Sequence, residues 1–303
     1  MKNKNNIKNF LINNFKFLKK RNLIEFFNQK NLRMNYSEVI ELAYDFQAGS
    51  YIDEVEKRAG MHDKYAKELS SIIGESIKSN SVVLDAGTGE MTNLSLLLKN
   101  IIRKPKKIYA FDTSWSRVHA GLRYAKKKNS TYFKNIVPFV SFMEKIALPD
   151  KSVNVTMTNH SLESNKKILK TIILELFRVT KDKIILCEPC YEINSKKGKK
   201  RMDKFGYIKN IEKIIIRLGG VIIRKYKIVN TINTLNPTVC YIISPPKKQG
   251  VNKIFFTIPG TNFKLKKFNN FYHSASIGLT FPILNKIPIL KIDNAIISSL
   301  LKK

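Results

Sequence analysis

The chain has 303 residues, of which 43% are hydrophobic, a share that is normal for a folded protein and argues against intrinsic disorder. No apolar run approaches the roughly 18 to 20 residues needed to span a bilayer, so we expect no transmembrane segment. The basic N-terminus is not followed by a small-residue cleavage site, so we also expect no signal peptide.

The formal net charge is +32, from 55 Lys and Arg against 23 Asp and Glu. Ten of the 55 basic residues are Arg, and Asn and Ile are also abundant. Nucleic-acid sites usually depend on Arg, whose planar group contacts phosphate or guanine at two points. We therefore interpret the charge as a compositional bias, and nucleic acid as a possible but not a favoured partner.

The three cysteines form one C-x-x-C pair, Cys187 and Cys190, and a single residue, Cys240. One pair without a second pair of Cys or His nearby does not complete a tetrahedral zinc site. We therefore expect no metal. Small buried side chains in a reducing compartment, the cytoplasm, are the favoured interpretation.

The N-terminal part reads as helical. Residues 1–35 carry apolar side chains at helical spacing among Lys and Asn, which predicts a basic amphipathic helix. Such a helix could lie on a membrane surface, but we expect it to pack its apolar stripe on its own protein. Residues 36–80 also look helical, and we assign residues 1–60 to an N-terminal extension.

From residue 82 onward, short apolar runs alternate with helical patterns. The predicted strands cover residues 82–84, 107–111, 136–142, 152–158 and 183–187, followed by a final antiparallel pair over 221–229 and 238–243. The predicted helices cover residues 91–102, 115–128, 166–180 and 208–218. This order predicts an α/β fold with a doubly wound, mostly parallel sheet over residues 61–246, in which ligands bind at the carboxyl ends of the strands.

The first predicted strand ends in a glycine turn. Asp85, Gly87 and Gly89 form a D-x-G-x-G pattern, in which glycine lets the backbone turn sharply and approach a ligand closely. The pattern is neither the G-x-G-x-x-G of dinucleotide-binding folds nor a phosphate loop. It resembles motif I of the Rossmann-like S-adenosylmethionine-dependent methyltransferases. The resemblance implies that these residues line the methionine end of the cofactor, S-adenosyl-L-methionine.

Two further acidic positions follow in the order that this family shows. Asp112 ends the second predicted strand, where a carboxylate accepts hydrogen bonds from ribose hydroxyls. Glu144, shortly before a Leu-Pro pair, resembles the position that reads the adenine amino group. We also assign Lys145 and Asn159 to the cofactor site. Each motif is weak evidence alone, but three in order at strand ends support the cofactor strongly.

The segments beyond the fourth and fifth strands face the same edge of the sheet. His160 follows the fourth strand, where the transferred methyl group should point, so it is the candidate general base. Glu163 could orient His160 or hold the substrate. Glu188 and Tyr191, past the fifth strand, complete the candidate catalytic set.

Other polar residues have weaker assignments. Arg201 and Tyr207 either clamp an anionic group or belong to the solvated surface, and the sequence leaves both interpretations open. Gln47 and Tyr51 could fold over the cofactor as a lid. The remaining histidines are expected to be structural: His62, His119 and His273.

The segments 158–165, 187–192, 200–207 and 235–238 together resemble a bacterial subgroup of methyltransferases often found beside surface-glycan genes. This resemblance implies a cytoplasmic enzyme that methylates an oxygen or nitrogen of a small molecule or glycan precursor. One alternative is an RNA or protein methyltransferase that uses the basic surface and a C-terminal module, which is described below. Another is a non-catalytic binding or scaffold protein of the same fold.

Residues 251–303 follow a linker that contains Pro and Gly, and they predict a small appended module. The run from Gly278 to Leu290 resembles the small zinc-ribbon-like activator of tRNA and release-factor methyltransferases. The cysteines that hold zinc in some of those relatives are missing, so no metal is expected. We expect the module to stabilise the catalytic domain or to position the substrate.

Overall fold

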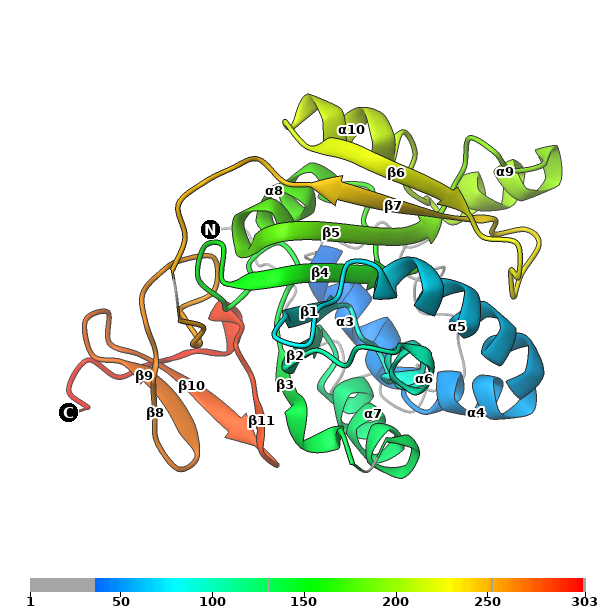
Figure 1. Cartoon of the computed structure of the whole chain (residues 1–303). Coiled ribbons are helices and arrows are strands. Elements are labelled where there is room, and N and C mark those ends of the chain that lie inside the picture. Colours follow the sequence, from blue (N-terminus) through cyan, green and yellow to red (C-terminus); the bar gives the residue numbers. More distant parts are fainter. Residues whose placement is uncertain (1–35, 130, 252, 302–303) are drawn as a thin grey trace.

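The computed structural model describes residues 36–129, 131–251 and 253–301, so the helix expected over 1–35 lies outside the described residues. A seven-stranded sheet with the order β3-β2-β1-β4-β5-β7-β6 forms its centre (Figure 1). The strands are β1 (Val82–Ala86), β2 (Lys107–Asp112), β3 (Ile136–Val140), β4 (Val153–Asn159), β5 (Thr180–Pro189), β6 (Val221–Lys227) and β7 (Thr238–Ser244). The pairs from β3 to β5 are parallel, whereas β7 is antiparallel to both of its neighbours. The predicted α/β sheet is therefore confirmed.

Helices cover both faces of this sheet. They are α3 (Tyr36–Phe46), α4 (Ser50–Lys57), α5 (Ala59–Gly74), α6 (Thr92–Asn100), α7 (Trp115–Lys128), α8 (Leu169–Val179), α9 (Lys196–Lys204) and α10 (Ile211–Arg217). Side chains of a strand alternate between the faces, and β1 shows the consequence. Leu84 packs with α8 and α10, whereas Val83 packs with α5, α6 and α7. None of the helices in the described part of the chain is long and apolar enough to cross a membrane.

The sheet has its switch point at β1. The chain runs from β1 to β2 and β3 on one side, then returns to place β4 and β5 on the other side. Asp85 therefore pairs with Ala110 of β2 on one side and with Met157 of β4 on the other. The connections after β1 and β4 leave in opposite directions, which opens a crevice at their carboxyl ends.

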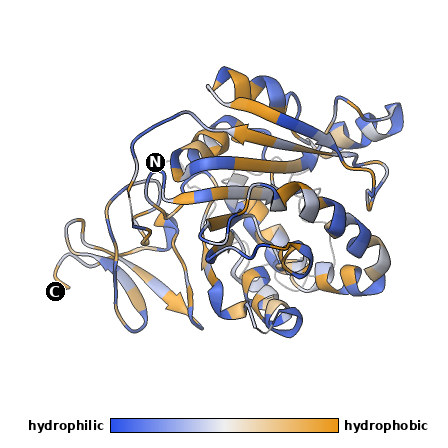
Figure 2. Cartoon of the chain, in the orientation of Figure 1, coloured by the Kyte–Doolittle hydropathy of each residue, from blue (hydrophilic) through white to orange (hydrophobic). Residues whose placement is uncertain are grey.

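The sequence did not predict helix α9. Its sequence is mainly hydrophilic (Figure 2) and offers no apolar stripe, which is the signal that periodicity detects. The helix forms because the Ser195 hydroxyl caps it by accepting a hydrogen bond from the Gly198 backbone N–H, and because its own Met202 side chain is fully buried. The cysteine interpretation needs a correction. The structure joins Cys187 to Cys240 in a disulfide between β5 and β7, and Cys190 is the free, buried cysteine.

The C-terminal residues form a small second sheet. Its strands are β8 (Lys266–Lys267), β9 (Phe271–Ser274), β10 (Leu279–Leu284), β11 (Ile287–Pro288) and β12 (Ile296–Ile297). Residues after β11 join the edge of the large sheet, because the Leu290 N–H donates to the Val140 carbonyl at 2.8 Å. Phe281 and Leu290 are fully buried in the same cluster as Leu84. The predicted module therefore shares its core with the large sheet.

Candidate active site

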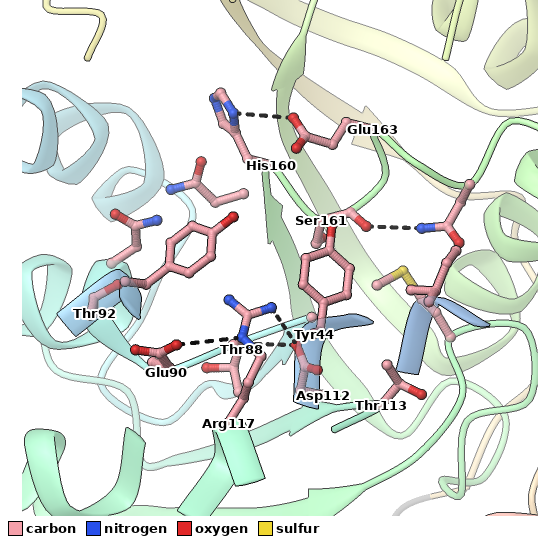
Figure 3. Close-up of a pocket in the computed structure, with 18 of the residues that line it drawn as sticks. Tyr44, Thr88, Glu90, Thr92, Asp112, Thr113, Arg117, His160, Ser161 and Glu163 are labelled. Carbon is pink, nitrogen blue, oxygen red and sulfur yellow. Dashed lines mark hydrogen bonds and ion pairs between the residues drawn. The ribbon is translucent and has the colours of Figure 1, made fainter. Parts of the chain in front are cut away.

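A pocket of about 350 Å³ lies at the carboxyl ends of the parallel strands, at the switch point. One end is lined by the glycine turn after β1, by Asp112 at the end of β2 and by Glu144 after β3. The other end is lined by His160 and Glu163, which follow β4. Figure 3 shows Arg117, Glu90 and Asp112 gathered at the first end, with His160 and Glu163 at the second. One cavity thus joins the two groups of residues that the sequence assigned to cofactor and catalysis.

Backbone geometry fixes the glycine turn. Gly87 and Gly89 have φ angles of 76° and 55°, in the left-handed region that favours glycine. The N–H groups of Gly87 and Thr88 donate to the Phe111 carbonyl at 2.9 and 2.8 Å, which ties the turn to β2. A Cβ on Gly87 would lie 2.4 Å from the Cβ of Ser161. The turn can therefore carry glycine alone at this position without a shift of the neighbouring loop.

An arginine that sequence analysis missed lies at the centre of this end. Arg117, from α7, stands with its guanidinium 4.8 and 4.7 Å from the ring centroids of Tyr44 and Tyr51. Its nitrogen atoms lie 3.8 Å from Glu90 and 3.8 Å from Asp112. Burial lowers the pKa of Arg117, but the charge of Asp112 and the other acidic neighbours outweigh it, so the pKa is raised and the side chain stays cationic.

The N-terminal helices close over the same end. The Ser37 hydroxyl of α3 donates to Glu144 Oε1 at 2.7 Å, and the Ile52 N–H of α4 donates to Glu90 Oε2 at 2.8 Å. Asp45 accepts a hydrogen bond from the hydroxyl of Ser114, which in turn caps α7. Tyr51 lines the pocket, as expected of a lid, whereas Gln47 does not.

Asp85 lies one layer behind the pocket. Its side chain is buried, accepts a hydrogen bond from the Thr88 hydroxyl at 2.6 Å, and borders a second cavity of only about 20 Å³. Asn93 and Asn159 line both cavities and connect Asp85 to the larger one. Burial raises the pKa of Asp85 to about 7, although the Thr88 bond lowers it and the charge of Asp112 raises it further.

His160 is held in an unusual backbone conformation. Its φ is 52°, and its N–H donates to the Cys187 carbonyl at 3.0 Å, so the loop after β4 is tied to β5. The ring has two polar partners: Nδ1 lies 3.6 Å from Glu163 Oε2, and Nε2 lies 2.7 Å from Thr238 Oγ1. Burial lowers the pKa of His160, but the nearby carboxylate of Glu163, with the charge of Glu188, outweighs it and raises the pKa above 6.5.

Besides Asp85, three residues of the predicted site do not line the pocket. Glu188 is buried below it, where its two carboxylate oxygens accept hydrogen bonds from the Ser161 and Leu162 N–H groups at 3.2 and 3.1 Å. Burial raises the pKa of Glu188 to about 7, while the charge of His160 lowers it. Tyr191 points away and donates to Asp203 of α9 at 3.1 Å. Lys145 is exposed to solvent. Strand-end position alone therefore does not decide which side chain faces the cavity.

Several pocket residues come from parts of the chain that gave no functional signal. The Tyr65 hydroxyl of α5 donates to Asn159 Oδ1 at 2.7 Å, and its ring stands 6.4 Å from that of His160. His62 also lines the pocket, although it was expected to be structural. Arg201 and Asn236 also line the pocket, and the Arg201 guanidinium donates to Asn236 Oδ1. Arg201 therefore lies where an anion clamp would need it.

Comparison with known proteins gives structural relatives only. No protein-family model and no curated protein matches the sequence. A SAM dependent methyltransferase from Aquifex aeolicus superposes with a TM-score of 0.50 at 20% identity, over 65% of this chain and 98% of that chain. Magnesium protoporphyrin IX methyltransferase from Synechocystis, with bound SAH, superposes with a TM-score of 0.51 at 13% identity, over 68% and 99% of the two chains. The fold is that of the S-adenosylmethionine-dependent methyltransferases.

On this methyltransferase fold, the first end of the pocket leaves polar groups without partners. Glu90 Oε1 and Arg117 Nε are both buried, and neither has a hydrogen-bond partner. Their separation of 3.8 Å exceeds hydrogen-bond distance, so each retains capacity for a ligand atom. Within residues 36–129, 131–251 and 253–301, no cluster of three or more His, Cys, Asp or Glu side chains could hold a metal ion.

Proposed function

We propose that this chain transfers a methyl group from S-adenosyl-L-methionine to an oxygen or nitrogen of a small molecule or glycan precursor. The observation that carries the proposal is the single pocket that runs from the glycine turn to His160. A bound cofactor and a bound acceptor would meet in one cavity, which methyl transfer requires because alignment supplies most of its acceleration.

The residues at the first end fit this cofactor. Asp112 lines the pocket at the position where a carboxylate accepts hydrogen bonds from ribose hydroxyls, and the backbone of Gly87 and Gly89 lies beside it. Glu144 is suited to the adenine amino group. The unpartnered Glu90 oxygen offers a buried carboxylate to the cationic groups of the ligand. Asp85 would act through Thr88, because its side chain lies behind the turn.

The second end is suited to accept a proton from the acceptor. The cofactor supplies an electrophilic methyl group on a sulfonium. The carboxylate of Glu163 only accepts hydrogen bonds, so it favours a proton on Nδ1 of His160. This tautomer leaves Nε2 free to accept from the Thr238 hydroxyl at 2.7 Å. We propose that the proton of the acceptor moves to His160 Nε2 through the hydroxyl of Thr238, which also lines the pocket.

A titration of the full chain with S-adenosylhomocysteine tests the cofactor assignment. We expect micromolar binding that depends little on salt, and binding at least ten-fold weaker for Asp112→Asn, which removes one charge-assisted acceptor worth about 1.5–3 kcal/mol. Asp182→Asn is the matched control, because Asp182 is exposed at the opposite end of β4 and β5. No binding to the wild type would favour the non-catalytic scaffold instead.

A second candidate is methylation of RNA, which α9 favours. Its nine residues, KKGKKRMDK, carry six basic side chains and one acidic side chain next to the pocket. Two results together would support this candidate. An RNA 20-mer should bind with an affinity that falls steeply with salt, and its binding should saturate at the same protein concentration as that of S-adenosylhomocysteine.

A further inference from the structure

We propose that the methyl acceptor is a phosphate ester with a free hydroxyl or amino group, and that Arg201 binds its phosphate inside the pocket. The identity of the bound group as a methyl acceptor rests on the proposed function. The anion site itself rests on the arrangement around Arg201, Asn236 and Tyr207, and it can be tested by itself.

Arg201 is held in one orientation by its neighbours. It leaves α9 half-buried, and its Nη1 donates to Asn236 Oδ1. Its guanidinium lies 5.1 Å from the ring centroid of Phe205 and 5.6 Å from that of Tyr207. These contacts fix the plane of the guanidinium, while most of its five N–H donors stay available. A fixed planar donor is suited to bind a phosphate at two points.

The two partners of Arg201 add donors. Asn236 and Tyr207 are 8% and 7% exposed and line the pocket. Burial raises the pKa of Tyr207 to about 12, with Glu163 raising it and Arg201 and Asn236 lowering it. The phenol therefore keeps its proton at neutral pH and can donate it. Arg201, Asn236 and Tyr207 form a donor-rich wall with one net positive charge.

No carboxylate neutralises that charge. None of the ion pairs in the described part of the chain includes Arg201. Two acidic residues of neighbouring segments face other side chains: Glu163 Oε2 lies 3.6 Å from His160 Nδ1, and Asp203 pairs with Lys209. A guanidinium in a pocket without a carboxylate partner is best satisfied by an anionic ligand.

The same cavity holds the proton-accepting pair, so one small molecule can reach both. Asn236 stands two residues before Thr238, and both line the pocket with His160. Three exposed lysines of α9 lie outside the pocket, and their charge would attract an anion toward Arg201 on the same helix: Lys196, Lys197 and Lys200. Because Asn236 and Tyr207 are buried, the site suits a molecule that enters the pocket better than a nucleic-acid backbone that lies across the surface.

Calorimetric titration with inorganic pyrophosphate tests the site in the full chain. We expect the wild type to bind, and Arg201→Gln to bind at least ten-fold more weakly. Arg201→Lys, which keeps the charge but loses the planar group, should fall between them. Arg217→Gln removes the same charge from the exposed end of α10 and should bind within two-fold of the wild type. Thermal unfolding of each variant checks the fold, and Arg201→Lys provides the test if Arg201→Gln does not fold.

Other results would overturn the proposal. Equal weakening by Arg217→Gln would show attraction to net charge rather than a site, and unchanged binding by Arg201→Gln would exclude Arg201. An RNA 20-mer that binds and is not displaced by pyrophosphate would replace the small acceptor with RNA. The same variants are titrated with S-adenosylhomocysteine. If the wild type did not bind S-adenosylhomocysteine, the methyltransferase proposal would be wrong. The pyrophosphate titration would then still decide whether the anion site exists.

Discussion

The two ends of the pocket are built in different ways. At the end proposed for the cofactor, backbone hydrogen bonds fix the glycine turn: the Phe111 carbonyl accepts from Gly87 and Thr88, and Asp112 accepts from the Gly89 N–H at 3.0 Å. Remote side chains such as Tyr44 and Arg117 complete this end. At the end proposed for the acceptor, side chains from remote segments form the wall, and Arg201 and Asn236 are 35 residues apart. The backbone of the glycine turn tolerates few substitutions, so we expect changes there to abolish cofactor binding. A side chain can be exchanged more easily, so we expect changes at the second end to alter the selectivity for the methyl acceptor.

The largest effect should follow Gly87→Ala. A Cβ at this position would lie 2.4 Å from Ser161 Cβ, on a backbone with a φ of 76°. The turn of the free variant should shift to relieve strain of about 1–3 kcal/mol, and restoring it on binding corresponds to roughly 5- to 150-fold weaker binding of S-adenosylhomocysteine. The clash adds to this cost. Gly206→Ala is the matched control, because it has a φ of 67° and no atom within 4 Å of an added Cβ. Equal affinities of Gly87→Ala and wild type, measured by calorimetry, would contradict a backbone-built cofactor end.

At the acceptor end, Glu163→Gln should lower the pKa of His160. Burial lowers this pKa, but the nearby carboxylate of Glu163 is the largest of the causes that raise it above 6.5. Because the pKa of His160 is raised in the folded state, its contact with Glu163 stabilises the fold fully at pH values below the pKa of an unfolded histidine. This stabilisation is lost as the pH rises through the pKa of His160 in the folded protein. NMR titration of the imidazole, assigned with His160→Gln, measures the shift. An unchanged or higher pKa in Glu163→Gln would rule out the contact between Glu163 and His160 on which the proposed tautomer rests.

The C-terminal sheet should affect the cofactor end through one lysine. Lys291 is 3% exposed, pairs with Glu41 of α3, and donates to the Thr113 carbonyl at 3.3 Å. Lys291→Met removes these interactions and should lower the free energy of unfolding by about 1–3 kcal/mol, with a small loss of S-adenosylhomocysteine affinity because α3 closes over the first end of the pocket. Lys286→Met, an exposed lysine of the same sheet, should change neither. Chemical denaturation of both variants decides whether the second sheet supports the lid.

The smallest effect is expected for Tyr191→Phe. The Tyr191 hydroxyl donates to exposed Asp203 and does not reach the pocket. Its removal should change the free energy of unfolding by no more than about 0.5 kcal/mol and leave ligand binding unchanged. Tyr207→Phe, by contrast, should weaken pyrophosphate binding. If Tyr191→Phe weakened it equally, the placement of Tyr191 outside the pocket would be wrong.

The same contrast between the two ends explains what the sequence predicts. The strands, α7 and the motifs at Asp112 and Glu144 are local patterns, so period and strand-end position are enough to find them. Arg117 was missed because it looks like an ordinary charge on an amphipathic helix, and only the fold places it between Tyr44 and Tyr51. Residues such as Tyr65 and Asn236 meet His160 and Arg201 through tertiary structure, which no short pattern records. Tyr191 was assigned by its strand-end position, which does not fix the direction of a side chain.

A crystal structure of the full chain with S-adenosylhomocysteine would show directly where the cofactor binds. We predict density between the glycine turn and Asp112, contacts to Glu144, and the ligand sulfur directed toward the end of the pocket that holds His160. Density elsewhere, or an empty pocket in crystals grown at saturating ligand, would contradict the division of this cavity into a cofactor end and an acceptor end.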